Sequence, residues 1–458
     1  MRDVTAIVMA AGKGTRLKSS QPKVLHTAAG RSLIGHVLEA LRPLGLGQIL
    51  VVVGADAELV QQEVDFCDVK GARTVVQPEP LGTADAVRTA LPYVNNDTSR
   101  VLVLPGDGPL VTAEALAQLC EHAEGVDVAL FTSVLHDPYG YGRIVRDDTQ
   151  SVTGIVEERD ADARQRLITE VNGGVYVFDR QVIVEVIDTF STDNAQGELY
   201  LTDAVAAIVG RGGDVATVTV PASITAGVND QVQLADAAAQ LRRRHLTALM
   251  RDRGVRVIDP PSTFVDVDVA VGEGTTLLPG TMLTQGTVIG AQATVGPNTH
   301  LSACTVGDGA VVQASTAHNT TIGARATVGP YAHLRDGTVL ASDTKVGAFV
   351  ETKNTRLGPG SKAPHLSYLG DAEIGQNVNI ACGVITVNYD GAVKSRTIIG
   401  DGAFIGCDTM LVAPVSIGKG AYTAAGSVIT EDVPDDALAI ARARQVLKDG
   451  WAKNRRGA

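Results

Sequence analysis

The chain has 458 residues, 45% of them hydrophobic, and a formal net charge of −12. The length predicts at least two domains with sizeable cores, and the acidic balance argues against nucleic acid as a partner. The sequence contains no run of about 18 apolar residues and no apolar segment of the signal-peptide type, so we expect a soluble, cytoplasmic protein without membrane insertion. Five scattered cysteines, never spaced as a CxxC pair, argue against a disulfide framework or a zinc site.

The first predicted element is a buried strand over residues 4–10, which leads directly into a glycine-rich turn. Glycines after a parallel strand let backbone N–H groups approach a phosphate, and Lys13, Arg16 and Lys23 add positive charge nearby. The spacing matches neither the dinucleotide fingerprint nor the P-loop. The pattern therefore predicts a phosphate-binding loop of another kind.

Strands and helices then alternate through the front half of the chain. We predict strands at 49–54, 73–77 and 101–104 and helices at 32–44, 56–64, 83–91 and 112–121. This alternation indicates an α/β domain with a Rossmann-like, doubly wound parallel sheet, in which ligands bind beyond the carboxyl ends of the strands. Gln77, Gly82, Thr83 and Asp107 fall at such ends. A carboxylate after a buried strand is a typical Mg²⁺ ligand, although an isolated Asp107 would as often be a turn residue.

The back half has a different period. Residues 231–250 lack Gly and Pro and show helical spacing, which predicts a long linking helix. From residue 265 to about 429 an aliphatic residue followed by a small one returns every six positions, as in Val271-Gly, Ile289-Gly and Ile322-Gly. This period predicts a three-sided prism, a left-handed parallel β-helix of hexapeptide repeats. Its exposed Val and Ile side chains favour self-association, most simply as a threefold ring.

Two segments, 351–368 and 387–396, interrupt the six-residue rhythm, and we expect loops that leave the prism there. Of nine histidines, His365 is the one that we select as a general base, because near neutral pH imidazole can accept a proton from the ammonium group of the attacking amine. Taken alone, each of the nine is more often structural than catalytic.

Several motifs together are highly specific. They are Ala10-Ala-Gly-Lys-Gly-Thr-Arg16, Pro22-Lys23, Leu81-Gly-Thr83, Tyr139-Gly-Tyr-Gly-Arg143 and Asn194-Ala-Gln-Gly-Glu-Leu-Tyr-Leu-Thr-Asp203. With the hexapeptide region, they resemble the bacterial bifunctional N-acetylglucosamine-1-phosphate uridylyltransferase/glucosamine-1-phosphate acetyltransferase family over nearly the whole chain. The resemblance implies a uridylyltransferase domain at 1–229, a helical linker at 230–252, and an acetyltransferase β-helix with a C-terminal tail at 253–458.

In the front half the resemblance implies that UTP and N-acetylglucosamine-1-phosphate bind, with uracil near Gln77 and Mg²⁺ at Asp107 and Asn229. Arg16 would add a phosphate contact. The implied UDP-N-acetylglucosamine site comprises Met9, Ala10, Ala11, Gly12, Lys23, Gln77, Gly82, Thr83, Pro105, Gly106, Asp107, Gly142, Glu157, Asn172 and Asn229. Ala84-Asp85 stands where the family commonly has Gly-His, and an added carboxylate can weaken nucleotide binding.

In the back half the resemblance implies acetyl transfer from acetyl-CoA to glucosamine-1-phosphate, with His365 catalytic and the sites shared within a homotrimer. The implied sugar-phosphate residues are Arg335, Lys353, Tyr368, Asn379 and Lys394. The implied acetyl-CoA residues are Cys382, Asn388, Tyr389, Cys407, Ala425 and Arg442, and both cysteines depart from the family pattern. Two alternatives stay open: a nucleotidyltransferase whose β-helix is purely structural, and a non-catalytic assembly protein.

Overall fold

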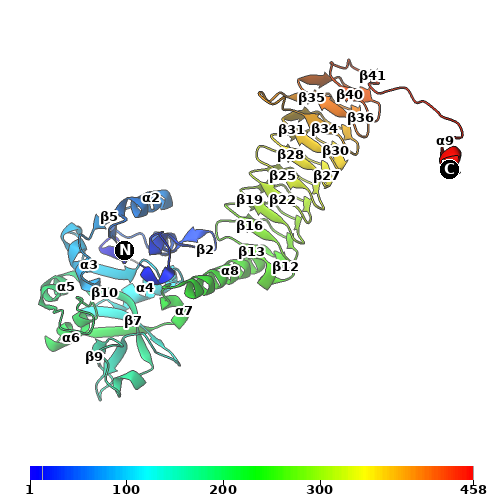
Figure 1. Cartoon of the computed structure of the whole chain (residues 1–458). Helices are drawn as coiled ribbons and strands as arrows, with labels where there is room; N and C mark the ends of the chain where they lie inside the picture. Colours follow the sequence, from blue (N-terminus) through cyan, green and yellow to red (C-terminus); the bar gives the residue numbers. More distant parts are fainter. Residues whose placement is uncertain (13, 457–458) are drawn as a thin grey trace. The chain divides into compact units, whose positions relative to one another are not determined.

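The computed structural model describes residues 1–12 and 14–456 (Figure 1). Lys13, one of the cations predicted at the glycine-rich turn, lies outside the described residues. The chain divides into two compact units, Met1–Leu241 and a second that begins at Arg242, and each has its own hydrophobic core. Within the described ranges, no helix has both the length and the apolar composition needed to cross a membrane.

The first unit is built on a nine-stranded sheet in the order β11-β7-β10-β6-β1-β4-β5, with β8 beside β10 and β9 beside β8. The strands are β1 Val4–Met9, β4 Gln48–Val53, β5 Ala72–Val76, β6 Arg100–Pro105, β7 Val128–Val134, β8 Arg143–Arg146, β9 Val152–Val156, β10 Glu170–Asp179 and β11 Val215–Thr219; a separate pair is β2 Thr27–Ala28 and β3 Arg31–Ser32. The neighbours β6, β1, β4 and β5 are parallel, whereas β10 runs antiparallel to β6 and β7. The sheet is therefore mixed rather than wholly parallel, because the hairpin β8–β9, and not a crossover helix, precedes β10.

Helices cover both faces of this sheet. They are α1 Leu33–Leu41, α2 Ala57–Cys67, α3 Thr83–Ala90, α4 Ala113–His122, α5 Arg180–Val186, α6 Asp203–Gly210 and α7 Ala222–Thr225, with 3₁₀ turns η1 Thr15–Leu17, η2 Lys23–Leu25, η3 Arg42–Leu44, η4 Leu91–Tyr93, η5 Gln165–Leu167 and η6 Ile187–Thr189. Ala6 and Val8 of β1 pack with α1, α2 and α4, and Ile7 packs with α3, α5 and α6. Because alternate side chains of a strand point to opposite faces, the sheet has two cores, which confirms the predicted doubly wound α/β fold.

The predicted linking helix is confirmed as α8, Gln231–Arg253. The boundary between the two units falls inside it, after Leu241. Val255, just past its end, returns to the core of the second unit, and the 3₁₀ turn η7, Pro260–Ser262, lies in the first coil, between β12 and β13.

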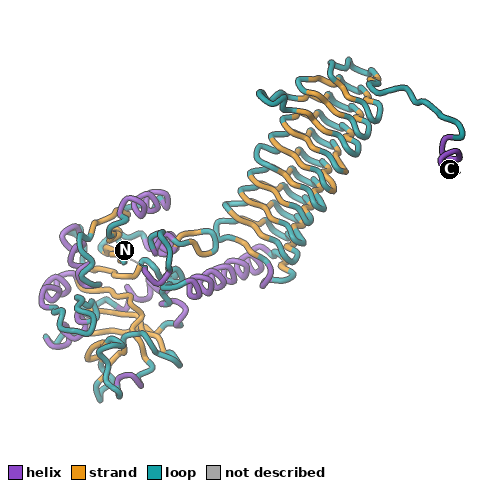
Figure 2. Tube along the Cα trace, in the orientation of Figure 1, coloured by secondary structure: helices purple, strands orange, loops and turns teal. Residues whose placement is uncertain are grey.

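The second unit is a coil of short strands on three parallel faces (Figure 2). Face 1 holds β12 Arg256–Val257, β15 Thr276–Leu277, β18 Thr294–Val295, β21 Val311–Val312, β24 Thr327–Val328, β27 Lys345–Ala348, β30 Lys362–His365, β33 Asn379–Ile380, β36 Phe404–Ile405, β39 Tyr422–Thr423 and β41 Leu438–Ala439. Face 2 holds β13 Phe264–Val265, β16 Met282–Thr284, β19 His300–Ser302, β22 Thr316–His318, β25 His333–Leu334, β28 Glu351–Lys353, β31 Tyr368–Gly370, β34 Ile385–Val387, β37 Met410–Val412 and β40 Val428–Ile429. Face 3 holds β14 Ala270–Val271, β17 Val288–Ile289, β20 Thr305–Val306, β23 Thr321–Ile322, β26 Val339–Leu340, β29 Arg356–Leu357, β32 Ala372–Ile374, β35 Thr397–Ile399 and β38 Val415–Ile417. A last helix, α9, spans Trp451–Arg456.

The six-residue period has a direct steric cause. The aliphatic residue of each repeat points inward and is buried, as Ile289 and Leu340 are. The next residue must be small, because a Cβ on Gly272 would clash with the backbone of Gly290 on the following coil. Buried threonines close the turns, as when the Thr275 hydroxyl donates to the Gly290 carbonyl at 2.8 Å. The hexapeptide β-helix prediction is confirmed.

One detail of that prediction was wrong. Residues 351–368 do not leave the prism, since they form β28, β29 and β30 in the regular order of the three faces. Thr352, Leu357 and Ala363 fill the inward positions and are fully buried, and of these only Leu357 is followed by the usual glycine, so the coil forms although two of its three repeats lack the aliphatic-Gly pair. The segment between β34 and β35 does depart from the coil, in a turn closed by pairing of Tyr389 with Lys394.

Candidate active sites

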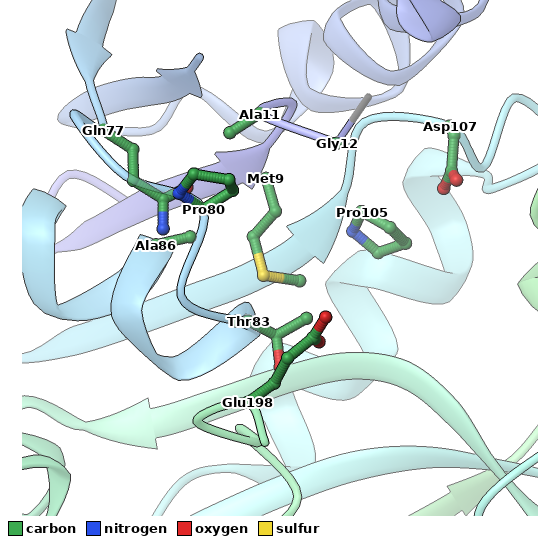
Figure 3. Close-up of a pocket in the computed structure, with 11 residues that line it drawn as sticks. Met9, Ala11, Gly12, Gln77, Pro80, Thr83, Ala86, Pro105, Asp107 and Glu198 are labelled. Carbon is green, nitrogen blue, oxygen red and sulfur yellow. The ribbon is translucent and has the colours of Figure 1, made fainter. Parts of the chain in front are cut away.

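A cavity of about 450 Å³ opens at the carboxyl ends of β1, β5 and β6 in the first unit (Figure 3). Its lining residues are Met9, Ala11, Gly12, Gln77, Pro80, Gly82, Thr83, Ala86, Pro105, Asp107 and Glu198. Gln77, Pro80 and Ala86 lie at one end and Asp107 at the other, with Met9 between them (Figure 3). Residues predicted from three distant segments therefore surround one space.

Two glycines of this cavity, Gly82 and Gly12, differ in what a side chain at their position would contact. A Cβ placed on Gly82 would clash with the backbone of Leu199, and its φ of 128° is one that other residues rarely adopt, so glycine is required here by the protein itself. A Cβ on Gly12 would meet no heavy atom within 4 Å. The backbone at Gly12 is thus open toward the cavity, as a phosphate-binding turn needs.

Charged side chains gather at the Asp107 end. The Lys23 ammonium forms an ion pair with the Asp107 carboxylate and also donates to Asn229 Oδ1 at 2.8 Å. Arg16 Nη2 donates to the same Asn229 oxygen at 2.8 Å. The structure therefore brings together both predicted metal ligands and two predicted phosphate-binding cations.

These residues fit a hard divalent cation. One atom, Lys23 Nζ, contacts oxygens of both Asp107 and Asn229, so the two oxygens converge on a single point. Carboxylate and amide oxygens are donors that Mg²⁺ accepts, with its other positions left to phosphate and water. Within the described part of the chain, no group of three or more His, Cys, Asp or Glu side chains could hold a metal. The two-oxygen set thus suits an ion that arrives with a nucleotide.

A second cavity, of about 670 Å³, includes the predicted sugar-binding residue Glu157. It is lined by Thr15, Arg16, Tyr139, Gly140, Glu157, Glu158, Arg159, Gln196 and Glu198. Glu198 also lines the first cavity. Gly142 and Asn172 adjoin this region, because the Asn172 amide donates to the Gly142 carbonyl at 2.8 Å and a Cβ on Gly142 would lie 3.5 Å from the Glu157 carboxylate. The predicted sugar-binding residues are therefore neighbours.

Glu157 is the perturbed acid of this region. Burial raises the pKa of Glu157, and the nearby carboxylates of Asp160 and Asp203 add to the shift. A hydrogen bond from the Thr202 hydroxyl, at 3.1 Å, opposes it. A buried carboxyl with one partner and space beside it is suited to bind a hydroxyl group.

Two further residues of the predicted nucleotide site are Ala10 and Gly106. Ala10 lines a smaller cavity of about 170 Å³ that shares Ala11, Gly12 and Gln77 with the first. The Gly106 amide donates to the Met9 carbonyl at 2.8 Å, which holds the ends of β1 and β6 together.

Asp85, the residue expected to disturb nucleotide binding, does not present a free charge. Its Oδ2 accepts a hydrogen bond from Gln77 Nε2 at 2.6 Å, and its Oδ1 pairs with Arg88 Nη2 at 2.5 Å. Asp85 also lies in the first turn of α3, where the helix N-terminus stabilises a negative charge. Asp85 therefore has no free carboxylate that would weaken nucleotide binding in the way expected from the sequence.

In the second unit, basic and aromatic side chains collect on face 2. Arg335 pairs with Glu351 at 2.8 Å, and Glu351 is in register with Tyr368 on the next coil. Lys353 lies close enough to Lys394 to lower the pKa of Lys394 through a side-chain contact and charge repulsion. Two ammonium groups held together form a site for an anion, and this is where the resemblance implies a sugar phosphate.

His365 belongs to a column that runs along one corner of the coil. Parallel pairing of Lys362 with Asn379, Asn379 with Phe404, and Phe404 with Tyr422 sets the register of four coils. The residues three positions after these partners are His365, Cys382, Cys407 and Ala425. His365 and three of the predicted acetyl-CoA residues thus share one corner on successive coils, about 4.8 Å apart. The predicted sugar-phosphate residue Asn379 begins the face 1 strand that leads to this corner.

Asn388 lies at another corner. Its amide donates to Asp371, whose other carboxylate oxygen accepts from Asn354 Nδ2 at 2.6 Å, so three coils are tied by side chains. These hydrogen bonds lower the pKa of Asp371 despite its burial. Tyr389 follows on the exposed turn, its hydroxyl donating to Gly391 O at 2.6 Å, and Arg442 is exposed after β41.

Comparisons with known proteins agree along the whole chain. Residues 6–169 match the model of the MobA-like NTP transferase domain, and residues 396–431 match that of the bacterial transferase hexapeptide (six repeats). The bifunctional protein GlmU of Mycolicibacterium gilvum is 48% identical, with 100% of this chain and 93% of the relative covered. The GlmU proteins of Geobacillus sp. (strain WCH70) and Heliobacterium modesticaldum are 45% and 47% identical, with 97% and 98% of each chain covered. The chain belongs to the GlmU family.

Membership of the GlmU family confirms the predicted resemblance and fold class. The chain is a bifunctional transferase, with an acetyltransferase and a uridylyltransferase activity, and neither a purely structural β-helix nor a non-catalytic assembly protein agrees with this. Sugar phosphates and nucleotides are the class of substrate, and the β-helix fits an oligomer.

Sequence reasoning left out several residues of these cavities. Glu198 lines the cavities of 450 and 670 Å³, and Tyr139 and Glu158 line the latter. Glu198 and Tyr139 stand inside motifs that carried the resemblance, so their place in the motif was the available signal. Asp371 gave none, because its partners Asn354 and Asn388 are 17 residues away on either side.

Proposed function

We propose that each unit carries out one of the two transfers at the site described for it. The first unit would transfer a uridylyl group from UTP to N-acetylglucosamine-1-phosphate. The second would transfer an acetyl group from acetyl-CoA to the amine of glucosamine-1-phosphate. The observation that carries the proposal is that Gly12, Gln77 and Asp107 line one cavity at the strand ends, with Lys23 in contact with both Asp107 and Asn229.

In the first unit, the sugar phosphate oxygen attacks the α-phosphorus of UTP while the bond to the β-phosphate breaks and pyrophosphate leaves. Gly12 and its neighbours contact the phosphates through backbone N–H groups, and Arg16 and Lys23 balance charge on the leaving group. Gln77, Gly82 and Thr83 hold uracil. Gly142, Glu157 and Asn172 hold the N-acetylglucosamine part.

Asp107 and Asn229 would hold Mg²⁺ with the nucleotide. When bound, the ion neutralises charge on the phosphate oxygens. Lys23, which contacts both of these side chains, would then move its ammonium onto phosphate oxygens. The support for this assignment is the common point on which the two oxygens converge.

In the second unit, the amine nitrogen of glucosamine-1-phosphate attacks the thioester carbonyl of acetyl-CoA. The new C–N bond forms as the C–S bond breaks, and the proton leaves the nitrogen for His365 and passes on to the departing sulfur. Arg335, Lys353, Tyr368, Asn379 and Lys394 bind the sugar phosphate. The acetyl-CoA residues are Cys382, Asn388, Tyr389, Cys407, Ala425 and Arg442.

We further propose that the second unit assembles as a homotrimer and that both reactions run in the cytoplasm, where UTP and acetyl-CoA are available. Tyr331 and Phe349 stack at 5.4 Å with 62% and 60% of their surface exposed. Aromatic surface of this kind favours burial against another copy. Residues 442–456 are exposed, which leaves them free to reach a neighbouring subunit.

A matched pair of variants tests the assignment. Asp107→Ala should lower pyrophosphate release from UTP and N-acetylglucosamine-1-phosphate by about 100-fold or more and leave CoA release unchanged. His365→Ala should do the reverse, with loss of CoA release by about 100-fold or more. Each activity is the control for the other. Normal pyrophosphate release by Asp107→Ala would refute the metal assignment, and unchanged CoA release by His365→Ala would remove that histidine from the mechanism.

A further inference from the structure

Gln77 is held in one orientation by a residue outside the proposed binding set. Its side chain is buried to 4% exposure at the end of the 450 Å³ cavity, and its Nε2 lies 2.6 Å from Asp85 Oδ2. An ionised carboxylate only accepts hydrogen bonds, so the carboxamide must turn its NH₂ group toward Asp85. The carbonyl oxygen is therefore the end of Gln77 that remains for a ligand.

Asp85 is itself fixed. It is 6% exposed, and its other oxygen pairs with Arg88 at 2.5 Å. The first turn of α3 adds the favourable field of a helix N-terminus. Among the residues that the structure describes, none donates a hydrogen bond to Gln77 Oε1. This oxygen is not one of the fully buried polar atoms without a partner, so it retains some access to the cavity. It is thus available from the cavity.

We propose that Asp85 is a positioning residue that sets base selectivity by fixing the Gln77 carboxamide with its oxygen toward the base. This rests on the proposed function, in which Gln77 meets uracil. Uracil presents an N3–H donor, which a fixed carbonyl oxygen accepts. Cytosine presents an unprotonated N3, an acceptor, so two acceptors would face each other at a buried position, and such a mismatch is strongly disfavoured.

The test is the ratio of kcat/KM for UTP to that for CTP in the full-length chain. Asp85→Asn keeps the shape but gives the side chain an NH₂ group, so the Gln77 carboxamide can turn over and pair with either base. We expect the UTP/CTP ratio to fall about tenfold or more, mainly through the KM values. Asp97→Asn, which makes the same charge change at an exposed position of the same unit, should keep the wild-type ratio.

A second measurement separates orientation from general damage. N3-methyl-UTP can pair with neither end of the carboxamide, so wild type and Asp85→Asn should both discriminate against it, whereas only Asp85→Asn should gain relative activity with CTP. A merely structural role for Asp85 would lower activity with UTP and CTP alike and leave their ratio within about twofold, which would overturn this proposal. A wild-type chain that does not release pyrophosphate from UTP would instead overturn the proposed function, and this inference with it.

Discussion

At Gly12 the effect of an added side chain on phosphate binding can be measured apart from its effect on stability. A Cβ there meets nothing within 4 Å in the protein, but it would occupy the space that a phosphate needs. We predict that Gly12→Ala raises the KM for UTP about tenfold or more and leaves the melting temperature unchanged. Steady-state kinetics and a thermal melt of the same preparation check this.

A matched control for this change is Gly125→Ala. Gly125 is also free of neighbours within 4 Å but lies in a turn away from the cavity, and its φ of 78° makes alanine unfavourable. It should lower the melting temperature and spare the KM. Equal KM values in wild type and Gly12→Ala would show that no phosphate approaches that backbone.

His36 makes the first unit sensitive to acid. Burial lowers the pKa of His36 from 6.5 to about 4, and a hydrogen bond with the Ala28 carbonyl at 2.8 Å only partly offsets this. The folded protein keeps the ring neutral, whereas the unfolded chain takes up a proton below about 6.5. The stability from this residue is complete above that pH and falls by about 3 kcal/mol as pH drops to about 4.

The His36→Gln variant isolates this effect, because glutamine can still donate to Ala28 but does not titrate. We predict that urea midpoints of wild type and variant diverge at pH 7 in favour of histidine and converge as pH approaches 4. Parallel pH profiles of the two proteins would contradict the assignment.

At the scale of elements, the corner formed by Asn354, Asp371 and Asn388 ties three coils together. Asp371→Ala would leave the buried Asn388 amide without its acceptor, which costs about 1–3 kcal/mol, whereas the exposed Asn354 amide can turn to water. Because Asn388 is a proposed acetyl-CoA residue, we predict a higher KM for acetyl-CoA. The rate of pyrophosphate release should not change, and a loss of both activities would indicate general misfolding instead.

Periodicity explains how much of the elements was predictable. Period 3.6 located α1 to α4 and α8, short apolar runs located β1, β4, β5 and β6, and period six located the prism. The direction of β10 was not predictable, because the burial pattern of a strand is the same whichever way it runs. The coil at 351–368 was missed because Thr352 and Ala363 fill inward positions without the usual aliphatic-Gly pair.

The candidate sites, like the fold, could be predicted only in part from the sequence. Glycines, acids and bases after strands could be marked on the sequence, because strand ends of a parallel sheet meet at one edge. Pairings between distant residues could not, such as that of Lys23 with Asn229, 206 positions apart, or the clamp of Asp85 on Gln77. The function of Asp85 was expected to be adverse, since only the structure shows that Arg88 and Gln77 take up its two oxygens.

At the scale of the molecule, each unit has its own core and its own candidate site. We therefore predict that purified Asp107→Ala and His365→Ala proteins, each inactive in the overall reaction, restore it when mixed. Acetylated sugar phosphate made by one would diffuse to the other, with a lag while it accumulates. Product mass with glucosamine-1-phosphate, acetyl-CoA, UTP and Mg²⁺ is the measurement, and a mixture no better than its parts would refute independent sites.

Residues at one corner of the coil are spaced by fixed steps, as in the column formed by His365, Cys382, Cys407 and Ala425. Every turn adds the same rise, about 4.8 Å, so the gap between His365 and any group further along this corner is a whole number of turns. Inserting one complete turn between residues 382 and 407 would preserve every inward side chain and yet lengthen the span that acetyl-CoA bridges in the proposed binding mode. The distance along this corner is thus set by the number of turns between two residues, whatever those residues are.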